Sequence, residues 1–354
     1  MDFILPVLLC TVILAIRIPL AIIAHFATFL FRNECLTPSL YQRITAVILK
    51  TFELYLPLWL LRKLFSGSAR GKRNRWIKKL DANNEQDGWE GYLIADGVDQ
   101  SEIGKDVDMV ILYAHGGGFV FGDALLLSDT FIDWIRAWRL SYGARTQILS
   151  LEYQLAPEHP FPAARDNMLA CYQWLINEKK ISPSKIAFAG DSAGGNLAVI
   201  SALHLINQSY TDPPAALILL SPYVSALSNT QSFINNASYD FTDVSWVNNN
   251  INLYIGDPNL LPSCPMISPL YESQTSGLPK VFACVGGFEI FLDDVKDFIG
   301  RLQQNDVKTD FVIDEANMHG YAISRVLSRN GAYDHTIIRI GKFLYGEKKL
   351  ISEI

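Results

Sequence analysis

The sequence predicts an α/β protein with a mostly parallel central sheet that helices flank on both faces. Past about residue 85, short apolar runs rich in β-branched residues alternate with longer amphipathic stretches. Such alternation is typical of β–α–β units, whose strands lie parallel and gather ligands at their carboxyl ends. The chain of 354 residues is long enough for one large domain of this class with additions.

The individual elements follow from the same pattern. The expected strands are 109–115, 146–153, 185–190, 215–220, 280–286 and 310–314. The expected helices are 162–178, 194–208, 290–304 and 332–345. The stretch 223–279 is longer than an ordinary connection and predicts an insertion that forms part of a lid. Its aromatic residues are candidates to line the mouth of a pocket: Phe233, Tyr239, Phe241, Trp246 and Tyr254.

The N-terminus carries the excess of apolar residues. Residues 3–31 are almost continuously apolar, with Arg17 and His25 as the interruptions. As a helix this run would be about 43 Å long, more than the roughly 30 Å hydrocarbon core of a bilayer. We therefore expect residues 1–31 to form a membrane helix, with a helix lying on the bilayer surface and a plain buried helix as alternatives. A cleaved signal peptide is disfavoured, because Asp2 stands where a basic segment would be.

Two further segments precede the α/β region. Residues 41–65 mix apolar and basic residues in a helical pattern, which predicts a helix at the membrane interface or against the α/β domain. The basic run 69–79 predicts a solvated loop or interfacial face, because the net charge of −6 gives no global attraction to nucleic acid. The expected division is an anchor at 1–31, amphipathic or cap helices and a basic linker at 32–85, and an α/β domain at 86–354.

Cysteines and histidines give no sign of a metal or cofactor site. The five cysteines are scattered, and no two form a C-x-x-C pair. This usage predicts neither a disulfide framework nor a zinc site. We expect no metal and no cofactor.

Residues His115-Gly116-Gly117-Gly118 end the apolar run at 109–115. Glycines leave backbone N–H groups bare, so a polarised carbonyl oxygen can approach them closely. A plain tight turn is the alternative interpretation. The oxyanion interpretation requires a nucleophile elsewhere in the chain, and His115 then has the structural role of holding the glycine loop.

The segment Gly190-Asp191-Ser192-Ala193-Gly194 supplies that nucleophile. It matches G-x-S-x-G between an apolar strand and an amphipathic helix, the context in which this motif presents a reactive serine. Small residues on either side allow the sharp turn that holds the hydroxyl out. Ser192 is the predicted nucleophile, and Gly116, Gly117 and Ala193 are the predicted oxyanion donors.

A serine hydroxyl needs a base, and the base needs an orienting acid. The chain order expected for this architecture is serine, acid, histidine. His319 lies in a loop after the last expected strand and is the predicted base, whereas His335 lies in a helical stretch and is expected at the surface. The acid candidates after the strand at 280–286 are Glu289, Asp293 and Asp294. The two aspartates also fit a solvated first helical turn.

These motifs carry a resemblance to the hormone-sensitive lipase family of α/β-hydrolases. The matching segments are HGGGF (115–119), YQLAPEHPFPAARDN (153–167), GDSAGGNLA (190–198) and MHGY (318–321). The resemblance covers roughly residues 85–345 and implies the α/β-hydrolase fold with a helical cap. Family members place the acid at the start of a D-P-L-x-D segment. The aligned segment here is EIFLD (289–293), so the resemblance implies Glu289 as the acid, with Asp293 as the alternative.

An anchor ahead of this fold is similar to the membrane-bound arylacetamide and steryl deacetylases of the family. The resemblance implies a serine hydrolase in the endoplasmic reticulum membrane that cleaves hydrophobic carboxylic esters, including acetylated sterols. The alternatives are an inactive ligand-binding receptor, an amidase or a triacylglycerol lipase.

The sequence favours no oligomeric state, and it gives opposing signals for the side of the membrane. Basic residues after the apolar run favour a cytosolic catalytic domain: Arg32, Arg43 and Lys50. The resemblance to lumenal enzymes favours the lumen, where the sequons at Asn207 and Asn236 would be accessible to glycosylation. Of these two signals we follow the resemblance, and we expect the catalytic domain on the lumenal side.

Overall fold

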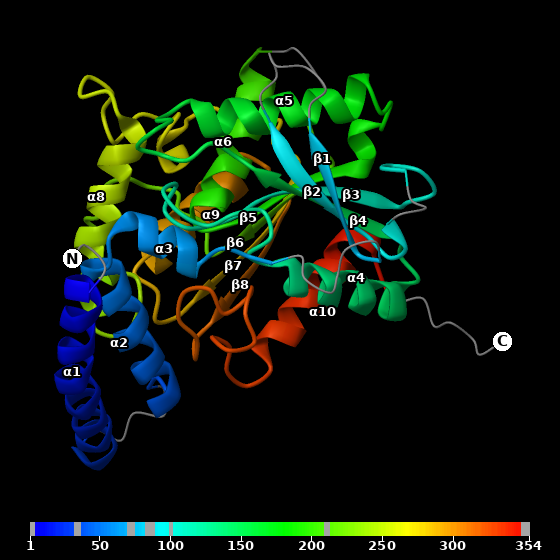
Figure 1. Ribbon diagram of the computed structural model, residues 1–354. Helices are drawn as coiled ribbons and strands as arrows, with labels where there is room; N and C mark the ends of the chain where they lie inside the picture. The colour runs from blue at the N-terminus through cyan, green and yellow to red at the C-terminus, as the bar shows by residue number, and fades with distance from the viewer. Residues whose placement is uncertain are drawn as a thin grey trace.

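A computed structural model describes residues 4–31, 37–68, 75–81, 89–98, 102–208 and 213–347. An eight-stranded sheet in the order β1-β2-β4-β3-β5-β6-β7-β8 crosses the middle of the molecule (Figure 1). Its strands are β1 (Ile77–Asp81), β2 (Glu90–Ile94), β3 (Met109–Ala114), β4 (Thr146–Glu152), β5 (Ile186–Asp191), β6 (Ala216–Leu220), β7 (Lys280–Gly286) and β8 (Thr309–Asp314). Strand β2 pairs antiparallel with β1 and β4, and the other neighbours are parallel.

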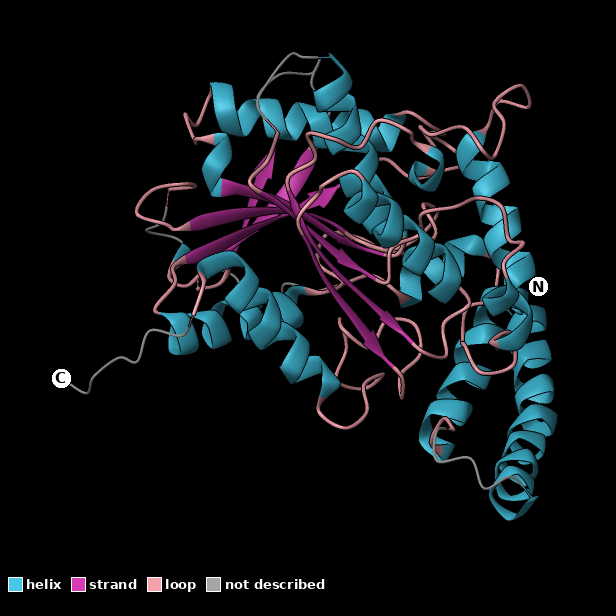
Figure 2. Cartoon of the chain, turned by 180° about the vertical axis from the view of Figure 1, so that it is seen from behind, coloured by secondary structure: helices cyan, strands magenta, loops and turns pink. Residues whose placement is uncertain are grey.

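Helices cover both faces of this sheet, as Figure 2 shows. One face packs against α4 (Ser128–Tyr142) and α10 (Ala332–Tyr345), and the other against α5 (Ala163–Asn177), α6 (Ala193–Gln208) and α9 (Leu292–Gln304). Alternation along β3 creates the two cores, because Ile111 and Tyr113 face α4 while Val110 and Leu112 face α5 and α6. Each such fully buried side chain contributes about 1.5–3 kcal/mol.

The six expected strands and four expected helices are confirmed. Helix α4, the edge strand β1 and its neighbour β2 were not expected. Only one of the five β1 residues is buried, and Lys78 and Lys79 interrupt any apolar run, so the sequence there carries no strand signal. The sheet begins at Ile77, ahead of the expected domain boundary at residue 86. Residues 69–74 of the basic run and Cys35 lie outside the described residues.

Three helices precede the sheet: α1 (Ile4–Phe31), α2 (Leu40–Tyr55) and α3 (Leu58–Leu64). The helix expected over 41–65 is two helices, because the chain turns at Pro57, which caps α3. Within α1, the 23 residues Leu5–Ala27 have a mean hydropathy of 2.6 and are long and apolar enough to cross a membrane. Only 6% of the most apolar window is buried. Helix α1 lies beside α2, at the edge of the molecule (Figure 1).

Helix α2 is fixed to the rest of the chain by polar contacts along its length. Near its start, the Gln42 side chain donates to the carbonyl of Ala316 at 3.2 Å. Further along, Lys50 Nζ donates to the carbonyl of Ala237 at 2.7 Å. Helix α2 therefore contacts α1 and is also bonded to the loop after β8 and to the β6–β7 connection.

The expected insertion lies between β6 and β7. It contains α7 (Gln231–Asn235), α8 (Val244–Ile255) and the short 3₁₀ helix η3 (Pro269–Tyr271). A second 3₁₀ turn, η2 (Pro183–Lys185), leads into β5. The side chains of Phe233 and Tyr254 are buried in the main core, while Tyr239 packs against Phe288. Phe241 and Trp246 line the pocket that contains Ser192, as expected, but Phe233, Tyr239 and Tyr254 do not line it.

Candidate active site

Ser192 lies in the sharp turn between β5 and α6. Its backbone has φ of 52°, a left-handed conformation that is strained for a residue with a side chain. The two flanking glycines explain how the turn closes. A Cβ on Gly190 would lie closer than 3.0 Å to the backbone of Gly194, and a Cβ on Gly194 closer than 3.0 Å to the carbonyl of Ala114. The G-x-S-x-G spacing is therefore a packing requirement of this turn.

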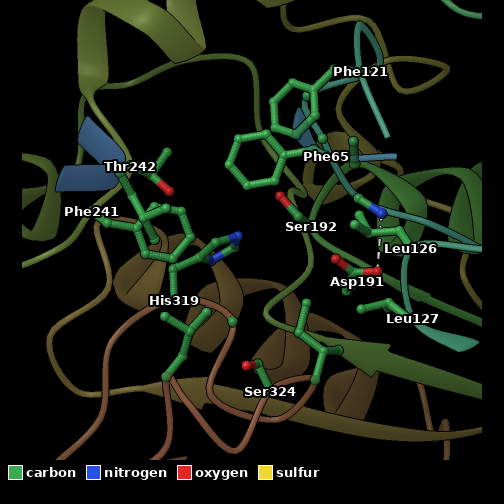
Figure 3. Close-up of a pocket in the computed structure, with 18 of the residues that line it drawn as sticks. Phe65, Phe121, Leu126, Leu127, Asp191, Ser192, Phe241, Thr242, His319 and Ser324 are labelled. Carbon is green, nitrogen blue, oxygen red and sulfur yellow. Dashed lines mark hydrogen bonds between the residues drawn. The ribbon is translucent and has the colours of Figure 1, made fainter. Parts of the chain in front are cut away.

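The imidazole of His319 and the carboxyl of Glu289 form the hydrogen bond expected of a base and its orienting acid. His319 Nδ1 and Glu289 Oε2 are 2.9 Å apart, and the Glu289 side chain is fully buried. Glu289 Oε1 accepts the Ser221 hydroxyl at 2.6 Å and the Gly286 N–H at 2.5 Å. Figure 3 shows the other side of the His319 ring directed toward Ser192 across the pocket.

The surroundings of His319 favour its charged form despite burial. Two aromatic rings, Phe241 and Phe291, meet the imidazole edge-to-face at centroid distances of 5.5 and 5.2 Å. Burial lowers the pKa of His319, but the hydrogen bond and charge of Glu289, with a further contribution from Asp240, raise it to about 9. The arrangement stabilises the imidazolium that forms when a base takes a proton.

Asp240 is a second buried carboxyl at this site. Its Oδ2 accepts the N–H of Ile290 at 2.9 Å, and its Oδ1 accepts the backbone N–H of His319 at 3.3 Å. Burial raises the pKa of Asp240 to about 6, although His319 opposes that shift. Sequence reasoning missed Asp240, because it lies in the polar insertion outside any motif and carries no signal that distinguishes it from neighbouring polar residues.

The other candidates have different surroundings. Asp293 Oδ2 accepts the Ser232 N–H at 2.8 Å, and Asp293 makes no hydrogen bond to His319. His335 is exposed, as expected. His115 stacks on Tyr153 at 4.2 Å and its Nδ1 lies 2.7 Å from the Gly116 carbonyl. Burial lowers the pKa of His115 to about 4, so the ring is neutral and supports the glycine loop.

The prediction that the N–H of Gly116 is an oxyanion donor is wrong. The N–H of Gly116 is already bonded, because it donates to Asp191 Oδ1 at 3.0 Å, which Figure 3 marks with a dashed line. Tyr113 donates to the same oxygen at 2.7 Å and fixes it. Within the part of the chain that the structure describes, the N–H groups of Gly117 and Gly118 have no hydrogen-bond partner, and both residues line the pocket. Gly118 therefore replaces Gly116 as the second candidate donor from this loop.

These groups meet in a pocket of about 560 Å³. Ser192, Ala193, His319 and the three glycines contribute to its wall. Helix α2, Phe65 just after α3, the insertion and the segments 126–133 and 320–327 supply much of the rest. The apolar lining includes Phe65, Phe121, Leu126 and Phe241, which Figure 3 labels, together with Leu49 and Trp246. Such a cavity has the size and the apolar lining of a site for a small hydrophobic ligand.

This sheet, turn and serine–histidine–glutamate arrangement define an α/β-hydrolase. A family model described as an alpha/beta hydrolase fold matches residues 111–323, more than half of the chain, and the chain belongs to that family. Among solved structures, an esterase from the bacterial hormone-sensitive lipase family is similar with a TM-score of 0.66 and 29% identity, covering 88% of this chain and 93% of that one. The resemblance to the hormone-sensitive lipase branch is thereby confirmed.

Two curated relatives have esterase names. An esterase of Acinetobacter venetianus is 35% identical over 205 residues, which is 57% of this chain and 64% of the relative. The carboxylic ester hydrolase LipN of Mycobacterium tuberculosis is 31% identical over 222 residues, 60% of this chain and 57% of the relative. In both cases the match spans less than two thirds of the relative's own length.

Proposed function

We propose that this protein is a serine hydrolase that cleaves carboxylic esters of hydrophobic substrates. The observation that carries the proposal is the 2.9 Å contact between His319 Nδ1 and Glu289 Oε2, with Ser192 in the same pocket. This contact leaves Nε2 of His319 free to take the Ser192 proton. The esterase names of the two curated relatives support the same reaction.

The reaction begins when Ser192 Oγ attacks the ester carbonyl carbon while its proton passes to His319. The carbonyl oxygen becomes an oxyanion, which the N–H groups of Gly117, Gly118 and Ala193 stabilise. One such donor is worth about 3 kcal/mol in the transition state. The intermediate expels the alcohol, which takes the proton from His319 and leaves an acyl-serine. Water then attacks the acyl-serine with His319 again as the base, releasing the acid and the free hydroxyl.

The substrate class follows from the lining and from the anchor. An apolar pocket beside an apolar helix suits an ester that is concentrated in a bilayer, and a short acyl group on a bulky apolar alcohol fits that description. Helix α1 would hold the enzyme at the endoplasmic reticulum membrane, with the catalytic domain on the lumenal side. An acetylated sterol or a similar lipophilic acetyl ester is the proposed substrate.

Labelling with a fluorophosphonate probe tests this function. We expect covalent labelling of the full-length protein and turnover of p-nitrophenyl acetate, and we expect Ser192→Ala to abolish both. A wild-type protein that binds hydrophobic esters but is neither labelled nor active would be a receptor and would overturn the proposal. Faster cleavage of p-nitroacetanilide than of p-nitrophenyl acetate would identify an amidase, and a preference for long-chain triacylglycerols would identify a lipase.

A further inference from the structure

Several buried polar side chains line the apolar pocket without belonging to the serine–histidine–glutamate arrangement, and two of them come from the helices α2 and α8. Glu53 comes from α2 and is 9% exposed, and Asn250 comes from α8 and is 4% exposed. A polar group in an apolar site loses the hydrogen bonds of water and is costly to bury without a partner. The hydrogen bonds of these two side chains therefore show what a ligand must supply.

Only one of the two carboxyl oxygens of Glu53 has a hydrogen bond among the described residues. Its Oε2 accepts the backbone N–H of Asp243 at 3.1 Å. Among the described residues no hydrogen bond engages Oε1. Burial raises the pKa of Glu53 to about 8, although the Asp243 N–H opposes that shift, so the neutral acid predominates at pH 7. In that form the carboxyl group both donates and accepts hydrogen bonds.

Asn250 adds a donor on the same wall. Its Nδ2 is buried and finds no hydrogen-bond partner in the described parts of the chain. Asp243 caps the N-terminus of α8, and Asn250 lies within α8 seven residues further along, about two helical turns. Val247, between them, also lines the pocket. The Glu53 and Asn250 groups thus belong to one wall, formed where α2 meets α8.

The remaining charged residues of the pocket differ from this pair. Asp129 is exposed, and the Arg325 side chain is 59% exposed and paired with Asp133 and Asp334. These groups are hydrated or paired and need nothing from a ligand. Glu53 and Asn250 are buried and have unused hydrogen-bonding capacity.

We propose that the α2–α8 wall is a polar subsite that binds an oxygen-bearing group of the substrate other than the scissile ester. The inference rests on the proposed esterase function and narrows its substrates to apolar esters that carry a hydroxyl group on the acyl or alcohol part. A hydroxyl both donates and accepts, so it pairs with Glu53 in either protonation state and offers an acceptor to Asn250 Nδ2. Glu53 is then a specificity residue that the N-terminal helices contribute to the catalytic pocket.

Two matched pairs of esters test this subsite in the full-length enzyme. One pair is p-nitrophenyl hexanoate and p-nitrophenyl 6-hydroxyhexanoate; the other is hexyl acetate and 6-hydroxyhexyl acetate. The measured quantity is the ratio of kcat/KM for the hydroxylated ester to that for its plain partner. An unpartnered hydroxyl in an apolar pocket lowers this ratio roughly ten- to hundredfold. For the wild type we expect a ratio near or above one in at least one pair.

Three variants assign the effect to Glu53. Glu53→Leu should lower the ratio about tenfold, and Glu53→Gln should keep it within about threefold, because an amide also donates and accepts. Leu49→Ala, one turn earlier on α2 and also in the pocket wall, should change both members of a pair alike. Thermal unfolding of each variant checks its fold.

A wild-type ratio below about 0.1 in both pairs overturns the subsite without any variant. An unchanged ratio in Glu53→Leu also overturns it. Failure of the wild type to cleave either plain ester is a different result, since it refutes the esterase function itself.

Discussion

Asp240 holds the backbone of His319, because its Oδ1 accepts the His319 N–H at 3.3 Å while its Oδ2 accepts the N–H next to Glu289 at 2.9 Å. One buried carboxyl from the insertion thus ties together the loops that present the base and the acid. The same insertion contacts the loop of Glu289 a second time through Ser232, whose hydroxyl donates to the Ile290 carbonyl at 2.6 Å. The insertion is therefore part of the catalytic framework as well as a wall of the pocket.

Asp240→Asn should move the acid limb of the kcat/KM profile to lower pH. The charge of Asp240 contributes to the raised pKa of His319, so its removal lowers that pKa. The base acts in its neutral form, and a lower pKa leaves more neutral imidazole at a given pH. Hydrolysis of p-nitrophenyl acetate from pH 5 to pH 10 measures the shift. Asp293→Asn is the control: its side chain makes no contact with His319, so the acid limb of the kcat/KM profile should stay in place. If the acid limb does not move in Asp240→Asn, Asp240 does not raise the pKa of His319.

Glu289→Gln should lower kcat on the order of 10²–10⁴, because the imidazolium of His319 loses its orienting charge. Asp293→Asn, which alters a side chain bonded to Ser232, should change kcat only a few-fold. Steady-state kinetics on p-nitrophenyl acetate, with circular dichroism to verify the fold, separates the two. The opposite ranking would make Asp293 the acid.

Gly194→Ala should destabilise the fold by several kcal/mol, because the new Cβ would overlap the Ala114 backbone; overpacking of this kind typically costs about 1–3 kcal/mol or more. Gly300 in α9 is the matched control, since nothing lies within 4 Å of a Cβ built there. Gly300→Ala should stabilise by roughly 0.4–1 kcal/mol. Thermal unfolding compares the two, and similar Tm values would show that the turn tolerates a larger residue.

Removal of residues 1–31 should leave kcat/KM for p-nitrophenyl acetate within about tenfold of the full-length value, because the groups that stabilise the transition state are untouched. The loss on an acetylated sterol held in a bilayer should be far larger, because the shortened enzyme no longer resides where that substrate is concentrated. Assays on both substrates decide the point. Equal losses would mean that α1 supports the fold.

The sequence predicts the central strands and the turn that holds Ser192 well, for physical reasons. Strands β3 to β7 are buried on both faces, so nearly every residue in them must be apolar, and the sequence shows them as continuous apolar runs. Gly190 is dictated by a backbone contact with Gly194, only four residues away. Local rules of this kind are legible in a single sequence.

The rest of the site depends on contacts between distant segments. The bond from Gly116 to Asp191 spans 75 residues and removes a donor that the glycine motif alone indicated. Glu53 meets Asp243 across 190 residues, and Asp240 meets His319 across 79. No spacing rule connects such pairs, so only the folded chain reveals them.

The insertion also constrains which asparagine of the protein can carry an oligosaccharide. Asn236 Nδ2 donates to the carbonyls of Gly287 and Glu289 at 3.1 and 2.7 Å, and its side chain is buried. An oligosaccharide attached to that nitrogen during translocation would take one of the two protons and hold the chain around Glu289 open. If the catalytic domain lies in the lumen, the active enzyme therefore leaves this sequon bare. Asn207 is exposed, although Ser209 of its sequon lies outside the described residues. We therefore expect any oligosaccharide on the active enzyme to be attached to Asn207.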